Sequence, residues 1–458
     1  MSEGRTADRT GAARMRVDAP GAPFSTALLL IAAAAIFGGA SRENPLRLAC
    51  VELCALPLAI VAVRRLVLVP GETHGGGLPL TILALVIAVP LLQLIPLPPG
   101  VWATLPGEVP RTEALRLAGL QAPWLSPTLS SDETGRAGLA LIPPAAMFLG
   151  GILFDRSDVR RLTWLWIGLA TTGLALGIAQ VVAGSQSAAY PYRTTNYGSL
   201  VGLFANRNHE ADFLLALLPL AVGVAVPAGP SQERAAAPRD HIPGSPLAWL
   251  FIPVSIVALG VIRSRAGVIL ATPAALAALA IAWRGSHPRR GRRPMAGIAA
   301  MIGLPVLAVA LFSLEPILGR FDSQRPAEFR FEAWPHVAAA AEAYLPLGAG
   351  LGSFDRVFEA VEPLSLVGPT YFNHAHNDYL ELWLETGWLG AAILALFLVW
   401  FAPAAWRAWR SGQPLAQAAS AAVVLLMAQS VVDYPLRTET LAVLFGFCCG
   451  VLARRPSA

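Results

Sequence analysis

Apolar stretches of about 20 residues recur along almost the whole chain, and this pattern limits the possible folds more than any other feature. A bilayer's hydrocarbon core is about 30 Å thick, so one helical span needs roughly 20 apolar residues. Of the 458 residues, 55% are hydrophobic and 14% are charged, and the mean hydropathy is +0.56. These values exclude a water-soluble globular domain. The sequence therefore predicts an all-α polytopic membrane protein with about twelve transmembrane helices. The candidate spans are residues 24–40, 46–63, 78–97, 137–154, 162–183, 211–228, 247–262, 266–283, 295–313, 387–404, 416–433 and 438–453.

The arginines predict the orientation of these spans. Every basic side chain is arginine, and the short connections carry clusters within residues 5–16, 64–65, 156–161, 284–293, 407–410 and 454–455. An even number of spans places all the clusters on one side, which the positive-inside rule identifies as the cytoplasm. The arginines do not form one face, which argues against nucleic-acid binding. The expected organisation is a cytoplasmic tail at 1–23, nine spans within 24–313, a large periplasmic loop at 314–386, three spans within 387–453 and a cytoplasmic tail at 454–458.

Neither the cysteines nor the first apolar stretch changes this interpretation. The cysteines lie inside apolar stretches without histidines at ligand spacing, so we expect neither a disulfide framework nor a zinc site. The cysteines are Cys50, Cys54, Cys448 and Cys449. We also expect no metal and no cofactor. The arginine-bearing head before residues 24–40 is typical of a signal peptide, but an uncleaved first span fits a chain with so many further spans.

Two outer helix ends carry polar clusters that could bind an anion. Arg263 and Arg265 lie in "VIRSRAGV", a turn on the predicted outer side, where excess arginine opposes the positive-inside bias. Such arginines commonly face a phosphate, although snorkelling to lipid headgroups also explains them. In "NRNHEAD", Asn206, Arg207 and His209 could bind phosphate or sugar hydroxyls. Helix capping is the alternative, but it does not explain an arginine at the positive end of a helix dipole.

The predicted periplasmic loop contains a further arginine and a glycine-rich segment. Arg330 lies in "FRFEAWPH" and could add a charge-assisted contact to a diphosphate. It is followed by "LPLGAGLGSF", in which Gly348, Gly350 and Gly352 alternate. Alternating glycines allow the backbone to approach a bulky ligand closely, and a flexible hinge explains them equally well.

The most specific motif is "YFNHAHNDYLELWLETGWLG", which leads from the loop into the next span. Asp378 followed by Glu381 indicates a helix start. His376 would then stand just before a helix N-terminus, whose partial positive charge keeps the imidazole neutral near pH 7. A neutral imidazole can accept a proton from a sugar hydroxyl. His374, two residues earlier, is the alternative base.

Taken together, these motifs resemble the O-antigen ligase and polymerase family of bacterial membrane glycosyltransferases. That family is marked by His, then Asn, Ser or Gln, nine residues, Gly, two residues, and Gly, Thr or Tyr. His376, Asn377, Gly387 and Gly390 satisfy this spacing. The "NRNH" cluster, the "SRAG" turn, the Arg330 segment, the glycine-rich loop and "DYPLRTE" at 433–439 are also similar, so the resemblance covers residues 200–450.

The resemblance implies a metal-independent, GT-C-like glycosyltransferase in the bacterial inner membrane, with its active site facing the periplasm. The donor would be an undecaprenyl-diphosphate-linked glycan, and the acceptor a glycan, lipid A core or a protein. Carried over to matching positions, Arg207, Arg265 and Arg330 would bind the diphosphate, with Arg263 as a further candidate, while His376 activates the acceptor hydroxyl. The expected supporting residues are Asn206, His209, His374, Asn377, Asp378, Glu381, Gly387 and Gly390.

Several functions stay open at this point. Ligation to lipid A core, polymerisation of repeat units, exopolysaccharide polymerisation and protein O-glycosylation share these motifs. Outside the family, the alternatives are a transporter or flippase of lipid-linked or anionic solutes, or a scaffold without catalysis. Transporters usually carry ionisable groups near the bilayer midplane and internal repeats. Here the ionisable groups gather at outer helix ends, and no repeat is visible.

Overall fold

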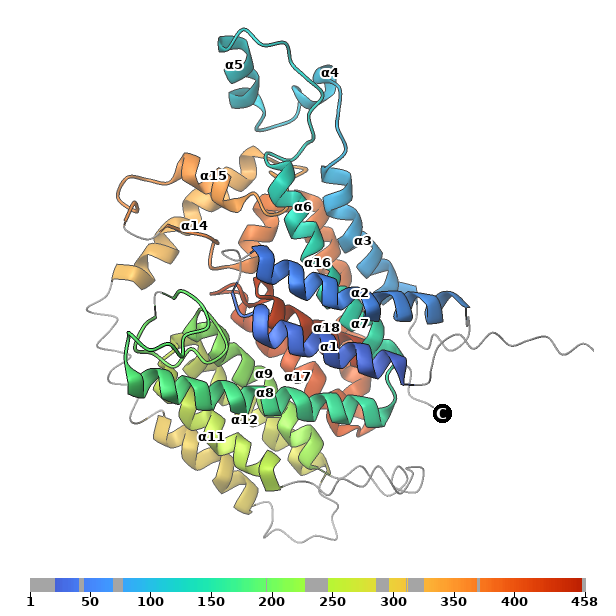
Figure 1. Cartoon of the computed structure of the whole chain (residues 1–458), viewed down its shortest axis with the longest axis vertical. Helices are drawn as coiled ribbons and strands as arrows, with labels where there is room; N and C mark the ends of the chain where they lie inside the picture. The colour runs from blue at the N-terminus through green and yellow to red at the C-terminus, as the bar shows by residue number, and fades with distance from the viewer. Residues whose placement is uncertain are drawn as a thin grey trace, which may run out of the picture.

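The computed structural model describes residues 21–40, 45–68, 77–194, 196–226, 246–285, 296–309, 311, 325–368 and 371–454. Within these ranges all regular secondary structure is helical, and the residues form no β-strand beyond an isolated bridge between Leu97 and Leu125 (Figure 1). This confirms the predicted all-α fold. Parts of the predicted tails, the arginines at 5–16 and 289–293, and residues 314–324 of the predicted loop lie outside the described residues.

Among the described residues, six helical segments are long and apolar enough to cross a membrane. They are α2 (Pro45–Leu68), α6 with α7 (Ser131–Leu139 and Ile142–Leu153), α8 (Arg156–Ala183), α9 (Arg207–Ala225), α12 (Arg265–Gly285) and α16 (Asp378–Ser411). Six shorter apolar helices coincide with the other expected spans. They are α1 (Ala22–Phe37), α3 (Gly77–Gln93), α11 (Pro246–Ile262), Ala296–Val309, α17 (Pro414–Gln429) and α18 (Glu439–Ala453). A count of twelve crossings stays a prediction.

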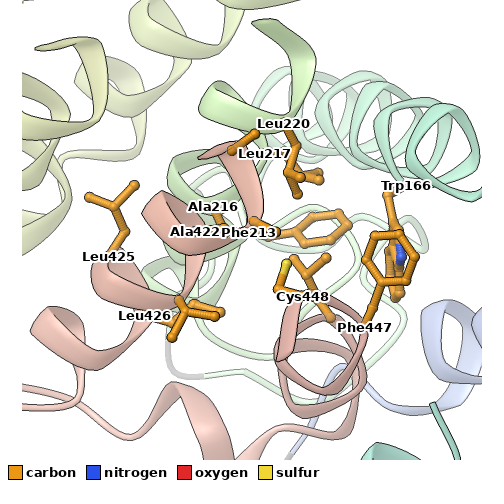
Figure 2. Packing of buried hydrophobic residues seen from close by; sticks show 14 of the residues in the cluster. Trp166, Phe213, Ala216, Leu217, Leu220, Ala422, Leu425, Leu426, Phe447 and Cys448 are labelled. Atoms are coloured by element: carbon orange, nitrogen blue, oxygen red, sulfur yellow. The ribbon is translucent and has the colours of Figure 1, made fainter. Parts of the chain in front are cut away.

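Helix α9 forms the centre of the bundle. Its most apolar window is 94% buried, and it packs against α8, α11, α12 and α17. Figure 2 shows apolar side chains of α8, α9, α17 and α18 meeting in one space, where the rings of Trp166 and Phe213 lie edge to face with centroids 5.8 Å apart. Small residues allow close helix approach elsewhere. Gly151 of α7, for example, lies directly against Gly450 of α18.

A second, smaller core lies outside the bundle. It joins α14 (Arg325–Ala343), α15 (Phe354–Val361) and the start of α16, through side chains such as Val337, Phe354 and Leu384. Helices α4 (Pro99–Trp102) and α5 (Val109–Leu117) project beyond it (Figure 1). The Trp102 side chain of α4 is fully buried, and its Nε1 donates to the Pro123 carbonyl at 2.9 Å.

Helix α16 is broken at Gly387, where the backbone adopts φ 53° and ψ −139°. The loop before α15 closes over this break. Trp388 N donates to the Pro346 carbonyl at 3.0 Å, and Ala349 N donates to the Leu384 carbonyl at 2.9 Å. A Cβ at Gly387 would overlap the Pro346 carbonyl, so the left-handed conformation and the close approach both require glycine here.

The alternating glycines of this loop therefore serve packing within the protein. A Cβ on Gly348 would overlap the α16 backbone, and one on Gly350 would overlap Thr128. Gln93 of α3 adds two bonds, donating to the Glu385 carbonyl and accepting from Leu351 N, each at 2.9 Å. Neither a bulky ligand nor a hinge accounts for these contacts. The loop therefore stabilises the break in α16 at Gly387, nine residues after the helix start at Asp378.

Candidate functional site

The start of α16 brings His376 to one end of the bundle, which the arginine pattern predicts to be the outer end. Asn377 is the N-cap, and its Oδ1 accepts from Tyr379 N at 3.1 Å and Leu380 N at 3.0 Å. The helix thus begins at Asp378, where the sequence predicted a start. His376 precedes the cap with a left-handed φ of 50°, a conformation uncommon for residues other than glycine. Such backbone conformations often occur at functional sites.

Asp433 is the centre of the polar cluster around His376. It follows α17, is 1% exposed, and its Oδ1 lies 3.1 Å from His376 Nδ1. Its Oδ2 accepts from Asn208 Nδ2 of α9 at 2.6 Å and lies 3.7 Å from Arg330 Nη1 of α14. One carboxylate therefore connects groups from α9, α14 and the segment before α16.

The charges in this cluster favour a neutral imidazole beside an ionised carboxylate. Burial raises the pKa of Asp433, but the Arg330 charge and the His376 hydrogen bond outweigh it and hold that pKa well below its ordinary value. Burial and the Arg330 charge lower the pKa of His376, against the opposing effect of Asp433. Near neutral pH the pair is thus Asp433 carboxylate and His376 imidazole.

This arrangement leaves a base available at the other ring nitrogen of His376. When the neutral ring carries its proton on Nδ1, it donates to Asp433 and keeps a lone pair on Nε2. Asp433 would also stabilise the imidazolium formed when Nε2 takes a proton, as the carboxylate of a catalytic triad does. The ring packs against Tyr434 at 4.8 Å and Phe372 at 6.5 Å, edge to face. The site can perform general-base chemistry on a hydroxyl.

His374 has a different environment. Its ring is buried, and its Nδ1 lies 2.8 Å from Glu381 Oε1. Glu381 also accepts from Ala375 N through Oε2 at 2.8 Å, and the Ala375 carbonyl accepts from Trp334 Nε1 at 2.9 Å. His374 and Glu381 therefore hold the segment that carries His376.

Arg437 stabilises the same helix start from the turn between α17 and α18. It forms ion pairs with three acids on consecutive turns of α16, at 3.7 Å to Asp378, 3.4 Å to Glu381 and 2.9 Å to Glu385. Burial lowers the pKa of Arg437, but the three carboxylates outweigh it and raise that pKa. The Asp378 backbone N–H also donates to the Ser430 carbonyl at 2.9 Å. The helix start is thus fixed to the bundle.

The "NRNH" cluster forms the start of α9 and contributes both capping and polar contacts. Asn206 is the N-cap, and its Oδ1 accepts from Asn208 N at 2.9 Å. His209 is buried, its Nδ1 lies 3.0 Å from Thr438 Oγ1, and its ring meets Tyr434 at 5.0 Å. The capping interpretation therefore holds for Asn206, while Asn208 reaches the central carboxylate.

The predicted diphosphate-binding arginines lie at the starts of three helices. Arg330 lies in the first turns of α14 and pairs with Asp433. Arg207 opens α9 and Arg265 opens α12, and these two helix starts are adjacent because Gly267 packs against Ala211. Arg263 lies in the preceding turn, exposed and with a left-handed φ of 55°. Binding of an anion by these arginines stays a prediction.

Several residues of this site were not assigned roles from the sequence. Asp433, Tyr434 and Arg437 appeared there only inside the motif "DYPLRTE", and Asn208 only as one member of a polar cluster. One signal could have identified Asp433. It is an acidic residue at the outer end of an apolar span, where an uncompensated charge is costly and requires a partner.

Part of the chain is similar to a known protein family. Residues 247–395 match a family model described as O-antigen ligase. The match runs from α11 into α16 and includes Arg263, Arg265, Arg330 and His376. No curated protein matches the chain.

Proposed function

The family match supports the assignment of this chain to the O-antigen ligases and polymerases, and on that premise we propose that it is a membrane glycosyltransferase. It moves a glycan from an undecaprenyl-diphosphate donor to an acceptor hydroxyl on the periplasmic face of the bacterial inner membrane. The observation that carries this proposal is the His376–Asp433 pair at 3.1 Å, flanked by Asn208 and Arg330.

In the proposed reaction, His376 Nε2 takes the proton of the acceptor hydroxyl as its oxygen attacks the anomeric carbon of the donor. The bond from that carbon to the diphosphate oxygen breaks, and the lipid diphosphate leaves with the bonding electrons. Asp433 stabilises the imidazolium that results. The reaction requires no change of oxidation state and no metal.

The negative charge that develops on the leaving diphosphate needs fixed cations, and we assign this role to arginines. Arg330 is 30% exposed while its guanidinium also faces Asp433, so part of it can meet a ligand beside His376. Arg207 and Arg265, at the adjacent starts of α9 and α12, complete the set, with Arg263 at its margin. Guanidinium groups suit this task because they bind phosphate oxygens through paired hydrogen bonds.

The test is complementation of a deletion strain, with surface glycans profiled. We expect His376→Ala to abolish transfer while the protein is still produced and inserted. His336→Ala is the matched control, because His336 lies exposed on α14, and it should restore the glycan. The glycan that the deletion strain lacks identifies the reaction. Lipid A core without polymer indicates a ligase, single-repeat chains indicate an O-antigen polymerase, and missing exopolysaccharide indicates an exopolysaccharide polymerase. Full complementation by His376→Ala would refute the assigned base.

A further inference from the structure

A basic cavity lies at the end of α16 opposite to His376. It forms where the first residue of α8, the last turns of α16, the start of α17 and the end of α18 meet. Its volume is about 70 Å³, and its mouth is open to solvent. Its polar lining consists of Arg156, Arg407, Arg454, Ser411 and Gln413. Arginines from three separate helices therefore face one space, far from the proposed catalytic site.

The rest of the lining is apolar and small. It consists of Ala404 and Ala408 of α16, Ala416 of α17, and Val451 and Leu452 of α18. Small side chains such as alanine leave space between packed helices that a longer apolar side chain would fill. The lining thus combines guanidinium groups with apolar side chains.

Ordinary helix-end electrostatics do not explain this convergence. The negative end of a helix dipole favours Arg407 and Arg454 near the ends of α16 and α18. Arg156, however, is the first residue of α8, where the dipole disfavours a cation. Burial lowers the pKa of Arg454, and Arg156 lowers it further, against the opposing effect of nearby acids. The two cations therefore repel each other across the space they share.

The nearest acids are engaged in capping α8. Asp155 Oδ1 accepts from Asp158 N at 2.7 Å, and Asp158 Oδ2 accepts from Asp155 N at 3.3 Å. Both carboxylates attract Arg454, yet neither lines the cavity, and no Asp or Glu among the described residues does. An anion entering the cavity would therefore meet guanidinium groups and no facing carboxylate.

We propose that this cavity binds a phosphate group, with an anionic phospholipid headgroup as the ligand that fits both parts of the lining. Guanidinium groups match phosphate oxygens in geometry and charge. The apolar side chains of the lining can contact the apolar part of a lipid, which a free phosphate ion lacks. The arginine clusters predict that this end faces the cytoplasm, where the membrane leaflet is anionic and basic pockets between helices bind lipid headgroups.

The test measures lipid binding to the purified full chain by native mass spectrometry after delipidation. The probes are phosphatidylglycerol, phosphatidylcholine with the same acyl chains, and inorganic phosphate. We expect phosphatidylglycerol to bind at least tenfold more tightly than phosphatidylcholine. Arg407→Gln should weaken phosphatidylglycerol binding about fivefold, the effect of one arginine near an anionic headgroup.

Two further variants separate a site from diffuse positive charge. Arg410→Gln is the matched control, because Arg410 lies three residues further along α16, over the Trp406 ring and outside the cavity. It should weaken binding less than twofold. Ala416→Met places a longer apolar side chain in the cavity without changing charge and should reduce phosphatidylglycerol binding as Arg407→Gln does. Arg407→Gln, Ala416→Met and Arg410→Gln should all keep the native melting temperature, so that a loss of binding is not a loss of folding.

The outcomes are distinct. Binding of inorganic phosphate that is lost in Arg407→Gln, without preference for phosphatidylglycerol, would support the phosphate site and identify a soluble ligand. Equal losses in Arg407→Gln and Arg410→Gln, or binding of neither phosphatidylglycerol nor inorganic phosphate, would overturn the proposal. Because the experiment measures lipid binding, its result does not depend on whether the protein transfers a glycan.

Discussion

Replacing Asp433 by asparagine tests the proposed chemistry most directly, because the side chain keeps its size and loses its charge. In the native protein the carboxylate faces three donors, namely His376 Nδ1 and Tyr434 N at Oδ1 and Asn208 Nδ2 at Oδ2, and one cation, Arg330. An amide has one acceptor oxygen, so it cannot satisfy the donors on both sides. If its NH₂ group faces His376, the ring must carry its proton on Nε2, the nitrogen that should act as the base.

In either amide orientation the negative charge that stabilises the imidazolium is lost. The same replacement in a catalytic triad lowers kcat about 10⁴-fold, so we expect kcat to fall about 10³- to 10⁴-fold, or roughly 4–5.5 kcal/mol in the barrier. The KM for the lipid donor should change little, because Arg330 is retained and is 30% exposed to solvent.

The assay is glycan transfer by protein reconstituted in nanodiscs, with kcat and KM measured separately. Glu359→Gln, an exposed acid on α15, is the matched control and should keep native kcat. Thermal unfolding checks that Asp433→Asn is folded. A folded Asp433→Asn protein that keeps more than a tenth of the native kcat would refute the role assigned to the Asp433–His376 pair.

Three further changes have defined outcomes. Arg330 lowers the pKa of His376, so Arg330→Gln should raise that pKa and move the acidic limb of the kcat/KM profile to higher pH; an unmoved limb would contradict this. Gly387→Ala should lower the free energy of unfolding by about 1–3 kcal/mol from its left-handed backbone alone, and overlap with the Pro346 carbonyl should lower the thermal stability further. Gly168→Ala, in open space on α8, should cause no such loss. Arg437→Met should lower the free energy of unfolding by about 3–5 kcal/mol because it removes the cation that buried carboxylates of α16 share. The resulting deficit in melting temperature should shrink as acidification protonates these carboxylates. A deficit independent of pH would rule out this explanation.

The fold and the site differ in how far the sequence could predict them. Apolar length and the polar cap before Asp378 predicted the helices and the position of His376, because both signals are local. The pair of His376 with Asp433 joins residues 57 positions apart, and no local pattern in one sequence records such a contact. Likewise, a glycine inside an apolar span is common in membrane helices, so Gly387 did not reveal that it breaks α16.

The attachment of the α16 start has a consequence for how new specificities could arise. His376 and Asp433 are both tied to the bundle, through the Asp378–Ser430 backbone bond and the ion pairs of Arg437. The outer helices α14 and α15 share a smaller core with the start of α16, and Arg330 and Trp334 connect α14 to the segment around the base. Evolution could therefore remodel α14 and α15 outside these shared contacts, and with them the choice of hydroxyl compound, while the proton-transfer machinery stays in register. A chimera that keeps Arg330, Trp334 and the side chains packed on α16 should accordingly retain turnover and acquire the selectivity of its new outer helices.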